Sequence, residues 1–273
     1  MALSLLTALQ AAFLGAIEGL TEFLPVSSTG HLILFADLVK FNIPSASVFE
    51  IVIQLGAILA VCVVYFEKLF GVLKGVATGK PASLHFATAV IIAFLPAALA
   101  GVLLHDFIKT VLFSPHIVAI SLILGGVIMI AIERRKPPSS VKAIEDFTPA
   151  LSLKIGLAQC LALIPGVSRS GATIIGALLM GVERKTAAEF SFFLAIPTMA
   201  GATAYDLWKN HASLSTDDIT TIIIGFITAF IVAWFVIRWF IGFVSTKGFI
   251  PFGWYRIAFG VAILAWLHYN FHI

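Results

Sequence analysis

Long apolar stretches with few charges run along most of the chain, which has 273 residues. A helix that crosses the hydrocarbon core of a bilayer needs roughly 20 predominantly apolar residues. Six stretches approach or reach this length, at residues 48–66, 84–104, 116–132, 188–206, 219–241 and 249–271. These runs are too long for transmembrane strands, and they do not alternate between apolar and polar positions. The pattern therefore predicts an all-α polytopic membrane protein.

Two further apolar regions are interrupted by polar residues. The first, residues 3–40, contains EGLTEFLPVSSTGH at 18–31, and the second, residues 150–182, contains IPGVSRSGAT at 164–173. In each region Pro, Gly and hydroxyl side chains divide the apolar run into two pieces that are too short to cross. Non-helical backbone survives at membrane depth only where protein or a water-filled cavity satisfies it. Both regions are therefore predicted to be re-entrant helix–loop–helix hairpins.

The two interrupted regions resemble each other. When the sequence is shifted by 141 positions, eight positions match between residues 15 and 40, and Ser27 then aligns with Ser168 and Gly30 with Gly171. Each hairpin is followed by three predicted spans, an odd number, so the second repeat should be upside down relative to the first. We expect a single membrane domain, residues 1–273, made of two inverted-topology repeats at about 1–140 and about 141–273.

Basic residues concentrate in alternate loops, which the positive-inside rule assigns to the cytoplasm. The loops on that side hold Lys68, Lys74, Lys80, Arg134, Arg135, Lys136, Lys142, Arg184, Lys185, Arg238 and Lys247. The opposite loops hold only Lys109 and Lys209, and the first hairpin has just Lys40. The first hairpin is thus expected to enter from outside and the second from inside, so that both breaks reach toward the midplane.

Composition supports the membrane assignment and argues against other classes. Hydrophobic residues make up 60% of the chain and charged residues 11%, whereas a soluble domain carries about 25% charged residues. The net charge is +3, and no basic run is interleaved with aromatics, so nucleic-acid binding has no support. Cys62 and Cys160 lie in apolar segments without a CxxC pair, which predicts buried thiols rather than a zinc site or a disulfide.

Glu18 and Glu22 are four positions apart in the first break, so on a helix they share one face and repel each other. Two carboxylates placed so in a membrane need a cation, a proton or an arginine. A divalent metal such as Mg²⁺ or Ca²⁺ would suit these hard oxygen ligands. The alternative is that one carboxyl is protonated or lies at the membrane interface. Because intramembrane ionisable residues are functional by default, we expect a functional pair.

Hydroxyl side chains follow directly in the first break. Pro25 should end the first helix, and Ser27, Ser28 and Thr29 are good N-cap residues for the next helix. A helix N-terminus is a ready anion site, because its free N–H groups and dipole favour negative charge. The three hydroxyls could merely cap a helix, but with both glutamates and His31 beside them a binding or catalytic role is favoured.

Arg169 is the one basic residue within either break, and Ser168, Ser170 and Thr173 surround it. An arginine at the bilayer centre costs about 2.5–3.5 kcal/mol on insertion scales, so something must compensate for it. Its planar fork fits phosphate or carboxylate oxygens in bidentate fashion. The alternative is a structural ion pair with one of the two glutamates of the first break.

Together the breaks supply helix N-termini, an arginine, two carboxylates, hydroxyls and a histidine, which suits attack or proton transfer on a polyanion. The simplest polyanion delivered within a membrane is a lipid phosphate or pyrophosphate. Glu50 and Gln54, one turn apart in the first predicted span, either back this site or bond between helices.

At this point the residues resemble a family. EGLTEFLPVSSTGH and PGVSRSGAT are similar to the two signature motifs of bacterial undecaprenyl pyrophosphate phosphatases of the bacitracin-resistance type. The similarity extends through nearly the whole chain, including FEIVIQLGAILAV at 49–61 and GFITAF at 225–230.

The resemblance implies an enzyme that removes the terminal phosphate of undecaprenyl pyrophosphate and so regenerates the lipid carrier for cell-wall polymers. It also implies a divalent metal, an active site on the outer side of the bacterial cytoplasmic membrane, and inverted repeats with re-entrant hairpins. By position, Glu18 and Glu22 belong to the acidic element and Ser28 and His31 to the catalytic element. We expect catalytic roles for Glu18, Glu22, Ser28, His31 and Arg169, with Glu18 and Glu22 also binding the metal. The residues that correspond to substrate- and phosphate-binding positions are Ser27, Thr29, Ser168, Arg169, Ser170 and Thr173.

Several points stay open at the level of sequence. The nucleophile is His31, or Ser28 with His31 or a glutamate as base, or a metal-bound water. The rival function is a flippase or transporter for the carrier lipid, because inverted repeats and broken helices are also transporter features. The expected partners are the lipid pyrophosphate, membrane lipid and, as one option, a second copy of the chain in a homodimer. The isoprenoid length and the preferred metal are not predicted.

Overall fold

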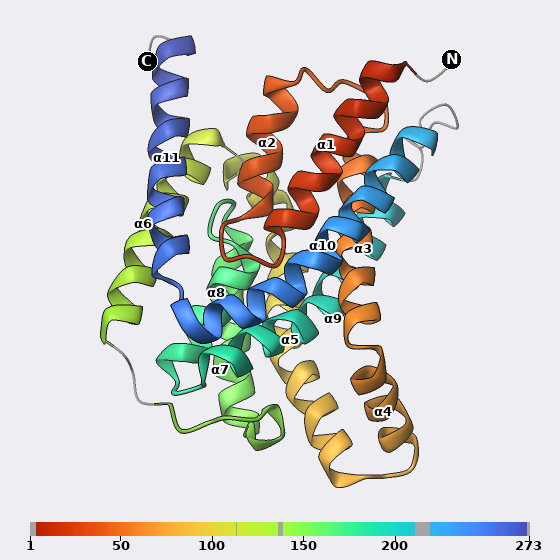
Figure 1. Ribbon diagram of the computed structural model, residues 1–273, viewed down its shortest axis with the longest axis vertical. Helices are drawn as coiled ribbons and strands as arrows, with labels where there is room; N and C mark the ends of the chain where they lie inside the picture. The colour runs from red at the N-terminus through yellow and green to blue at the C-terminus, as the bar shows by residue number, and fades with distance from the viewer. Residues whose placement is uncertain (1–3, 113, 136–138, 211–218, 272–273) are drawn as a thin grey trace.

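The computed structural model describes residues 4–112, 114–135, 139–210 and 219–271. Within these residues the regular structure is helical, apart from one isolated bridge between Val141 and Val182. The α-helices are α1 (Leu5–Thr21), α2 (Ser28–Leu38), α3 (Ala46–Val64), α4 (Phe66–Ala77), α5 (Pro81–Phe107), α6 (Pro115–Arg135), α7 (Pro149–Cys160), α8 (Arg169–Leu179), α9 (Arg184–Asn210), α10 (Ile219–Lys247) and α11 (Ile250–Phe271). Short turns of π-helix, η1 (Ile108–Leu112), and of 3₁₀ helix, η2 (Ile144–Asp146) and η3 (Leu161–Leu163), join some of them (Figure 1).

The predicted spans are confirmed. Six helices in the described part of the chain are long and apolar enough to cross a membrane, and they are α3, α5, α6, α9, α10 and α11. Each contains most of one predicted stretch, with ends that differ by a few residues because prolines at 81 and 115 start α5 and α6. The chain is therefore a multi-pass membrane protein.

The loop expected after the first span was predicted wrongly, since most of it forms the helix α4. This helix has 12 residues, too few to cross a bilayer, so its pattern did not register as a span. Its residues Phe66, Phe70 and Leu73 are exposed, as expected for a helix at a membrane surface. Cys62 and Cys160 are free thiols that are only partly buried, so the prediction of buried thiols was wrong.

Both interrupted regions form a helix, a loop and a second helix. The first loop, residues 22–27, joins α1 to α2, and the second loop, residues 164–168, joins η3 to α8. Each loop ends on a serine with positive φ, 69° at Ser27 and 76° at Ser168, and each serine side chain accepts a hydrogen bond from a glycine N–H three residues later. Both bounds of α8 lie 141 residues after those of α2, the shift found in the sequence. Positive φ is uncommon for non-glycine residues, so the shared strain marks two loops of the same local design.

The helices that flank the loops pack closely against long helices. The helix α1 lies along α10, α7 lies along α5, α6 lies along α11, and α3 contacts both α9 and α10 (Figure 1). Small residues allow this approach, because a Cβ at Gly15 would meet the backbone of Gly225, and one at Gly156 would lie 2.5 Å from the carbonyl oxygen of Ala93. Helix association in lipid depends on such close backbone contact.

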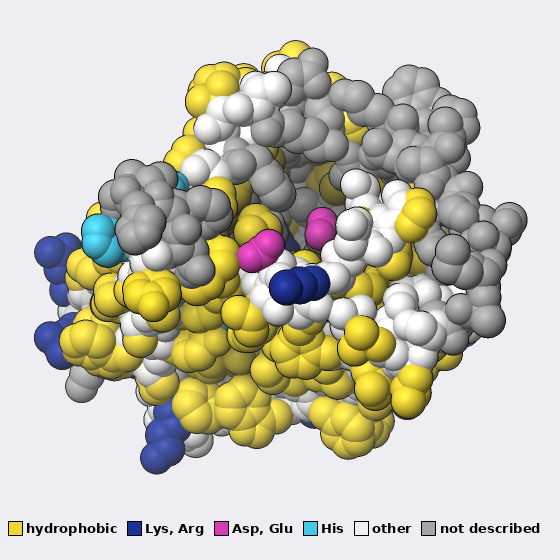
Figure 2. All heavy atoms as spheres, turned by 90° about the horizontal axis from the view of Figure 1, so that it is seen from above, with side chains coloured by type: hydrophobic (Ala, Val, Ile, Leu, Met, Phe, Trp, Pro, Cys, Tyr) yellow, Lys and Arg dark blue, Asp and Glu magenta, His cyan; other side chains and the backbone are white. Residues whose placement is uncertain are grey.

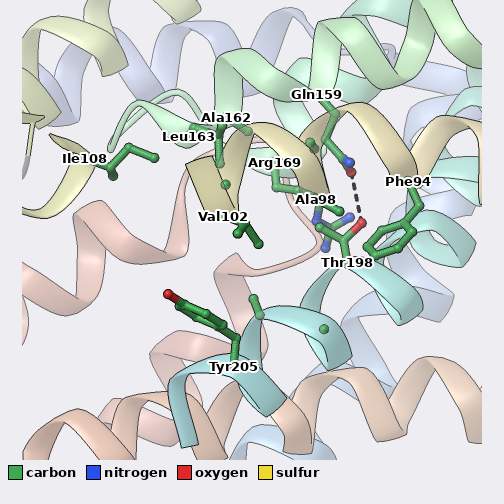
Figure 3. Close-up of a pocket in the computed structure, with 14 residues that line it drawn as sticks. Phe94, Ala98, Val102, Ile108, Gln159, Ala162, Leu163, Arg169, Thr198 and Tyr205 are labelled. Carbon is green, nitrogen blue, oxygen red and sulfur yellow. Dashed lines mark hydrogen bonds between the residues drawn. The ribbon is translucent and has the colours of Figure 1, made fainter. Parts of the chain in front are cut away.

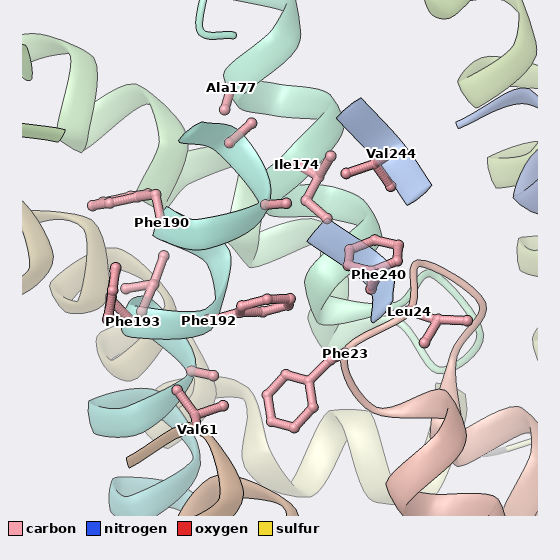
Figure 4. Packing of buried hydrophobic residues seen from close by; sticks show 14 of the residues in the cluster. Phe23, Leu24, Val61, Ile174, Ala177, Phe190, Phe192, Phe193, Phe240 and Val244 are labelled. Carbon is pink, nitrogen blue, oxygen red and sulfur yellow. The ribbon is translucent and has the colours of Figure 1, made fainter. Parts of the chain in front are cut away.

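The largest buried apolar cluster fixes the first loop. Phe23 and Leu24 of this loop point into a group of side chains from α8, α9 and α10 (Figure 4). Phe23 is fully buried, and its ring meets that of Phe192 edge to face at a centroid distance of 5.3 Å. Such aromatic pairs contribute about 0.5–1.5 kcal/mol beyond their burial. The loop residue that precedes them, Glu22, is therefore held between the two halves of the chain.

The glycine contact between α1 and α10 gives a direct test of this packing. We expect Gly15→Ala to lower the free energy of unfolding by about 1–3 kcal/mol, because the new methyl group would lie 3.0 Å from the Cα of Gly225. The matched control is Gly242→Ala on α10, where no atom lies within 4 Å of the added Cβ. Thermal unfolding in detergent should separate the two variants, and equal midpoints would contradict the proposed packing.

Candidate active site

The two loops meet at the carboxylate of Glu22. One oxygen, Oε1, accepts a hydrogen bond from Nη2 of Arg169 at 2.9 Å, and the other, Oε2, accepts one from the hydroxyl of Ser28 at 2.5 Å. Glu22 and Ser28 are buried, and the side chain of Arg169 is 12% exposed. One carboxylate therefore joins a hydroxyl of the first helix–loop–helix region to the guanidinium of the second. The ion pair considered from the sequence is present in this geometry.

Further contacts orient the guanidinium of Arg169. Its Nη1 donates to the main-chain carbonyl of Ser191 on α9 at 2.9 Å and lies 3.2 Å from the Ser191 hydroxyl. The hydroxyl of Thr173 donates to the same serine oxygen at 2.8 Å, and the ring of Phe23 lies 5.8 Å from Cζ of the arginine. Its Nε is buried and has no hydrogen-bond partner among the described residues. The fork is thus fixed on two nitrogens and keeps a donor on the third.

The other hydroxyls of the second break are engaged in structural hydrogen bonds. Ser170 is fully buried and donates to the carbonyl of Leu24 in the first loop at 2.8 Å. Ser168 caps α8 through Gly171 and lies 3.0 Å from the hydroxyl of Ser170. In the first break, Ser27 caps α2 in the same way, whereas Thr29 is only partly buried in the first turn. The two serine caps fix the starts of α2 and α8, and the bond from Ser170 to Leu24 holds the start of α8 against the first loop.

Glu18 lies one turn before Glu22 on α1 and is fully buried. Neither of its carboxyl oxygens has a hydrogen-bond partner among the described residues. The charged groups that act on it are Glu22, Glu50 of α3 and Arg169. A buried carboxylate without a partner is costly, and either a divalent cation or a proton shared with Glu22 would satisfy it. The described residues contain no group of three or more His, Cys, Asp or Glu that could hold a metal, and at this site the carboxylates on offer are those of Glu18 and Glu22.

His31 points away from this cluster and toward α11. Its Nδ1 lies 2.7 Å from the carbonyl oxygen of Ser27, and its Nε2 lies 2.7 Å from the hydroxyl of Tyr255. Because a carbonyl only accepts, Nδ1 carries the proton, and Nε2 then accepts from the tyrosine. The ring is buried and stacks on Phe259 at a centroid distance of 4.1 Å. The structure therefore brings Glu18, Glu22, Ser28 and Arg169 together. His31 lies outside this cluster, between the first turn of α2 and the helix α11.

Three residues near the site were missed at the level of sequence. Tyr255 contacts His31, and Ser191 contacts Arg169. Arg256, also on α11, is buried and donates to carbonyls of both loops. A signal for Arg256 was present, because an arginine inside a predicted span is a functional candidate in its own right. No comparable signal marks a serine or a tyrosine in an apolar helix.

A cavity of about 540 Å³ lies beside the cluster, between α5, the end of α7 and α9 (Figure 3). Its walls are mostly apolar, with side chains such as Phe94, Val102 and Leu163, and Arg169 forms part of its lining. Gln159 accepts a hydrogen bond from Thr198 at 3.4 Å close to the arginine. An apolar chamber with a cation on its wall suits a molecule that has an anionic head and a hydrocarbon chain.

Comparison with models of known protein families gives a match over most of the chain. The family model described as "Bacitracin resistance protein BacA" matches residues 11–262. The chain belongs to this family. The family resemblance inferred from the two motifs is thereby confirmed.

Curated relatives match along nearly their full length. The chain is 54% identical over 252 residues to "Undecaprenyl-diphosphatase 2" of Paramagnetospirillum magneticum, covering 92% of this chain and 96% of the relative. It is 53% identical over 256 residues to "Undecaprenyl-diphosphatase" of Parvibaculum lavamentivorans, covering 94% and 95%. It is 52% identical over 254 residues to the protein of the same name from Sphingopyxis alaskensis, covering 93% and 96%.

The role of the Arg169 fork can be tested with a substitution that keeps the charge. We expect Arg169→Lys to lower turnover of a lipid pyrophosphate on the order of 100-fold, because a compact ammonium lacks the planar fork that spans Glu22 and Ser191 while Nε stays available. Arg238→Lys is the matched control, since that arginine is exposed on α10 and contacts the ring of Trp234. Turnover of purified, folded Arg169→Lys close to that of the control would contradict the assigned role.

Proposed function

We propose that the protein is an undecaprenyl-diphosphatase, which hydrolyses the terminal phosphate of undecaprenyl pyrophosphate to give undecaprenyl phosphate and inorganic phosphate. The observation that carries the proposal is the Glu22 carboxylate, which joins a serine hydroxyl to an arginine of the other loop. A hydroxyl on a carboxylate base beside a guanidinium is suited to phosphoryl transfer. The names and near full-length identity of the relatives support the same substrate.

We assign Ser28 as the nucleophile and Glu22 as its base. The hydroxyl proton of Ser28 passes to Glu22 while the oxygen attacks the terminal phosphorus. The new O–P bond forms as the bond from that phosphorus to the bridging oxygen breaks, and undecaprenyl phosphate leaves with the proton from Glu22. Water then attacks the serine phosphate and gives a proton to Glu22, which returns it to the departing Ser28 oxygen. Inorganic phosphate leaves, and both residues are restored.

The contacts of His31 support this choice over the alternatives in which His31 is the nucleophile or the base. Both ring nitrogens are engaged, with Ser27 and with Tyr255, and neither bonds the hydroxyl of Ser28. His31 holds the carbonyl of the positive-φ residue directly before the nucleophile. We therefore give it the role of fixing this turn, since a nucleophile or base must lie within hydrogen-bond reach of its reacting partner.

Arg169 binds the terminal phosphate in this proposal. Its Nε is a buried donor without a partner among the described residues, and a phosphate oxygen supplies the missing acceptor. A charge-assisted hydrogen bond from this one N–H, together with the positive charge of the guanidinium, also stabilises charge that develops in the transition state. The cavity that Arg169 helps to line gives the isoprenoid chain an apolar path between α5 and α9.

Glu18 and Glu22 fit a divalent cation, Mg²⁺ or Ca²⁺. The fit rests on the buried Glu18 carboxylate, whose oxygens lack donors in the described part of the chain. Mg²⁺ is commonly held by one or two carboxylates together with substrate phosphates and water, so a pair of glutamates is enough. When bound, the ion neutralises part of the negative charge of the pyrophosphate. The protein's own part is to present Glu18 one helical turn behind the base.

We also propose that the two halves are inverted repeats whose loops enter the membrane from opposite sides. The 141-residue shift relates α2 to α8, and the packing partners are exchanged accordingly, with α1 on α10 and α7 on α5. Lys and Arg concentrate in the loops that the positive-inside rule assigns to the cytoplasm. We therefore propose that the protein lies in the cytoplasmic membrane with its active site open to the outside. The face seen in Figure 2 is hollowed near its middle, with acidic and basic side chains beside the hollow. A homodimer stays a prediction, and the site does not require one because both loops belong to one chain.

The proposed function is tested by phosphate release from the lipid itself. Purified protein in detergent, given undecaprenyl pyrophosphate and Mg²⁺ or Ca²⁺, should release phosphate, and Ser28→Ala should abolish the release. Ser245→Ala is the control, because Ser245 is exposed on α10 and bonds only the carbonyl of Ile241. A wild-type protein that releases no phosphate but moves the lipid between leaflets would be a flippase, and the proposal would be wrong.

Metal dependence gives a separate test of Glu18. Glu18→Gln keeps the shape of the side chain and removes its charge, so the metal concentration for half-maximal phosphate release should rise at least about tenfold. Glu67→Gln serves as the control, since Glu67 is exposed in the first turn of α4. Equal metal titrations for the two variants would restrict Glu18 to a structural role.

The orientation of the repeats can be tested by cysteine labelling. After Cys62 and Cys160 are replaced by Ala, a single cysteine is placed at Asn42 or at Lys185, both exposed positions that follow the two hairpins. In cells whose cytoplasmic membrane is intact, an impermeant thiol reagent should label position 42 and spare position 185 until the cytoplasmic side is opened. Labelling of both from outside would rule out the inverted arrangement.

A further inference from the structure

Arg256 of α11 is a charged side chain that is almost completely buried, with 1% of its surface exposed. Its three nitrogens donate to five main-chain carbonyls, so each of the five N–H groups of the guanidinium has an acceptor. The acceptors, at 2.9–3.4 Å, belong to Pro25, Ser121, Leu122, Gly166 and Val167. The side chain therefore has no donor left for a substrate phosphate.

Three of these carbonyls lie in the two loops of the proposed active site. Pro25 precedes the cap residue Ser27 by two positions, and Val167 directly precedes the cap residue Ser168. Both carbonyls accept from the same nitrogen, Nη1, at 3.1 and 2.9 Å. A single atom thus links the loop that carries Glu22 to the loop that begins the helix of Arg169.

The surroundings of Arg256 form a socket that fits this side chain closely. A Cβ on Gly125 of α6 would clash with Nη2, and a Cβ on Gly171 of α8 would lie 3.1 Å from Nη1. The carbonyls of Leu122 and Ser121, also on α6, accept hydrogen bonds from Nε and Nη2 of the guanidinium. Because α6 lies along α11, the socket ties both loops to one rigid helix pair.

We propose that Arg256 is a positioning residue of the active site, which holds the two loops in the register that brings Ser28, Glu22 and Arg169 together. The proposal rests on the phosphatase function argued above and adds a residue that never touches the substrate. Loop carbonyls at membrane depth have no water to bond, so the five donors set the loop positions as well as satisfying the backbone. A displacement of about 1 Å at a reacting group can cost on the order of 100-fold in rate.

The first test uses Arg256→Lys, whose single ammonium cannot reach the acceptors on both loops and on α6. We expect kcat for phosphate release to fall on the order of 10- to 100-fold, with KM for the lipid close to that of the wild type. The matched control is Arg184→Lys, because Arg184 forms an ion pair with the buried Glu133 at 2.6 Å, away from both loops. It should lower the unfolding midpoint without lowering kcat. A folded Arg256→Lys protein with wild-type kcat would overturn the proposal.

Two further measurements keep the test decisive if Arg256→Lys folds poorly or the wild type has a different activity. Gly125→Ala leaves Arg256 in place but presses on Nη2, and it should lower kcat selectively, whereas Gly242→Ala should not. Hydrogen exchange, which needs no substrate, should show faster exchange at residues 22–31 and 164–173 in Gly125→Ala and Arg256→Lys than in Arg184→Lys. Unchanged exchange in these segments would reject the proposed role of Arg256, independently of whether the wild type releases phosphate.

Discussion

Backbone polar groups of a loop that is buried within a protein must find hydrogen-bond partners there, and much of this structure follows from that constraint. Both loops interrupt apolar helical regions, and each begins its second helix with a serine in an uncommon positive-φ conformation. The serine side chains satisfy N–H groups of the new helices, and Arg256 satisfies the carbonyls that the loops expose. The apolar anchor Phe23 then fixes the first loop in the core.

The same constraint explains why chemistry gathers at the loops. A carboxylate and a guanidinium are each costly to bury, and the structure places Glu22 and Arg169 within 2.9 Å of each other. The second oxygen of Glu22 receives the hydroxyl of Ser28, so a charge pair needed for burial also provides a base for a nucleophile. Glu18 is the exception, since its oxygens have no donor among the described residues. An unsatisfied carboxylate beside the pair is where a cation would contribute most.

Sequence reasoning recovered those features that are local in the chain. Apolar run length identified the six spans, and the clusters of Pro, Gly and hydroxyl residues identified both loops. The charged and hydroxyl residues Glu22, Ser28 and Arg169 were all selected, because such side chains are conspicuous in an apolar sequence. The helix α4 was missed because it is too short to produce a spanning signal.

Features that depend on contacts distant in the chain could not be predicted. Arg256 lies more than 200 residues from Pro25, one of its acceptors, and main-chain carbonyls carry no sequence signal. The direction of His31 depends on α11, where Tyr255 and Phe259 receive its ring. The sequence left His31 open as the nucleophile or as the base for Ser28, whereas in the structure Ser28 contacts Glu22 and His31 contacts Tyr255.

The central claim is that Ser28, activated by Glu22, attacks the terminal phosphate. Rapid quench of the protein with substrate labelled in that phosphate tests it most directly, because phosphoserine survives acid whereas phosphohistidine survives base. The account predicts an acid-stable phosphoenzyme that disappears in Ser28→Ala and still forms in His31→Ala. An acid-labile, base-stable phosphoenzyme that persists in Ser28→Ala and disappears in His31→Ala would contradict it.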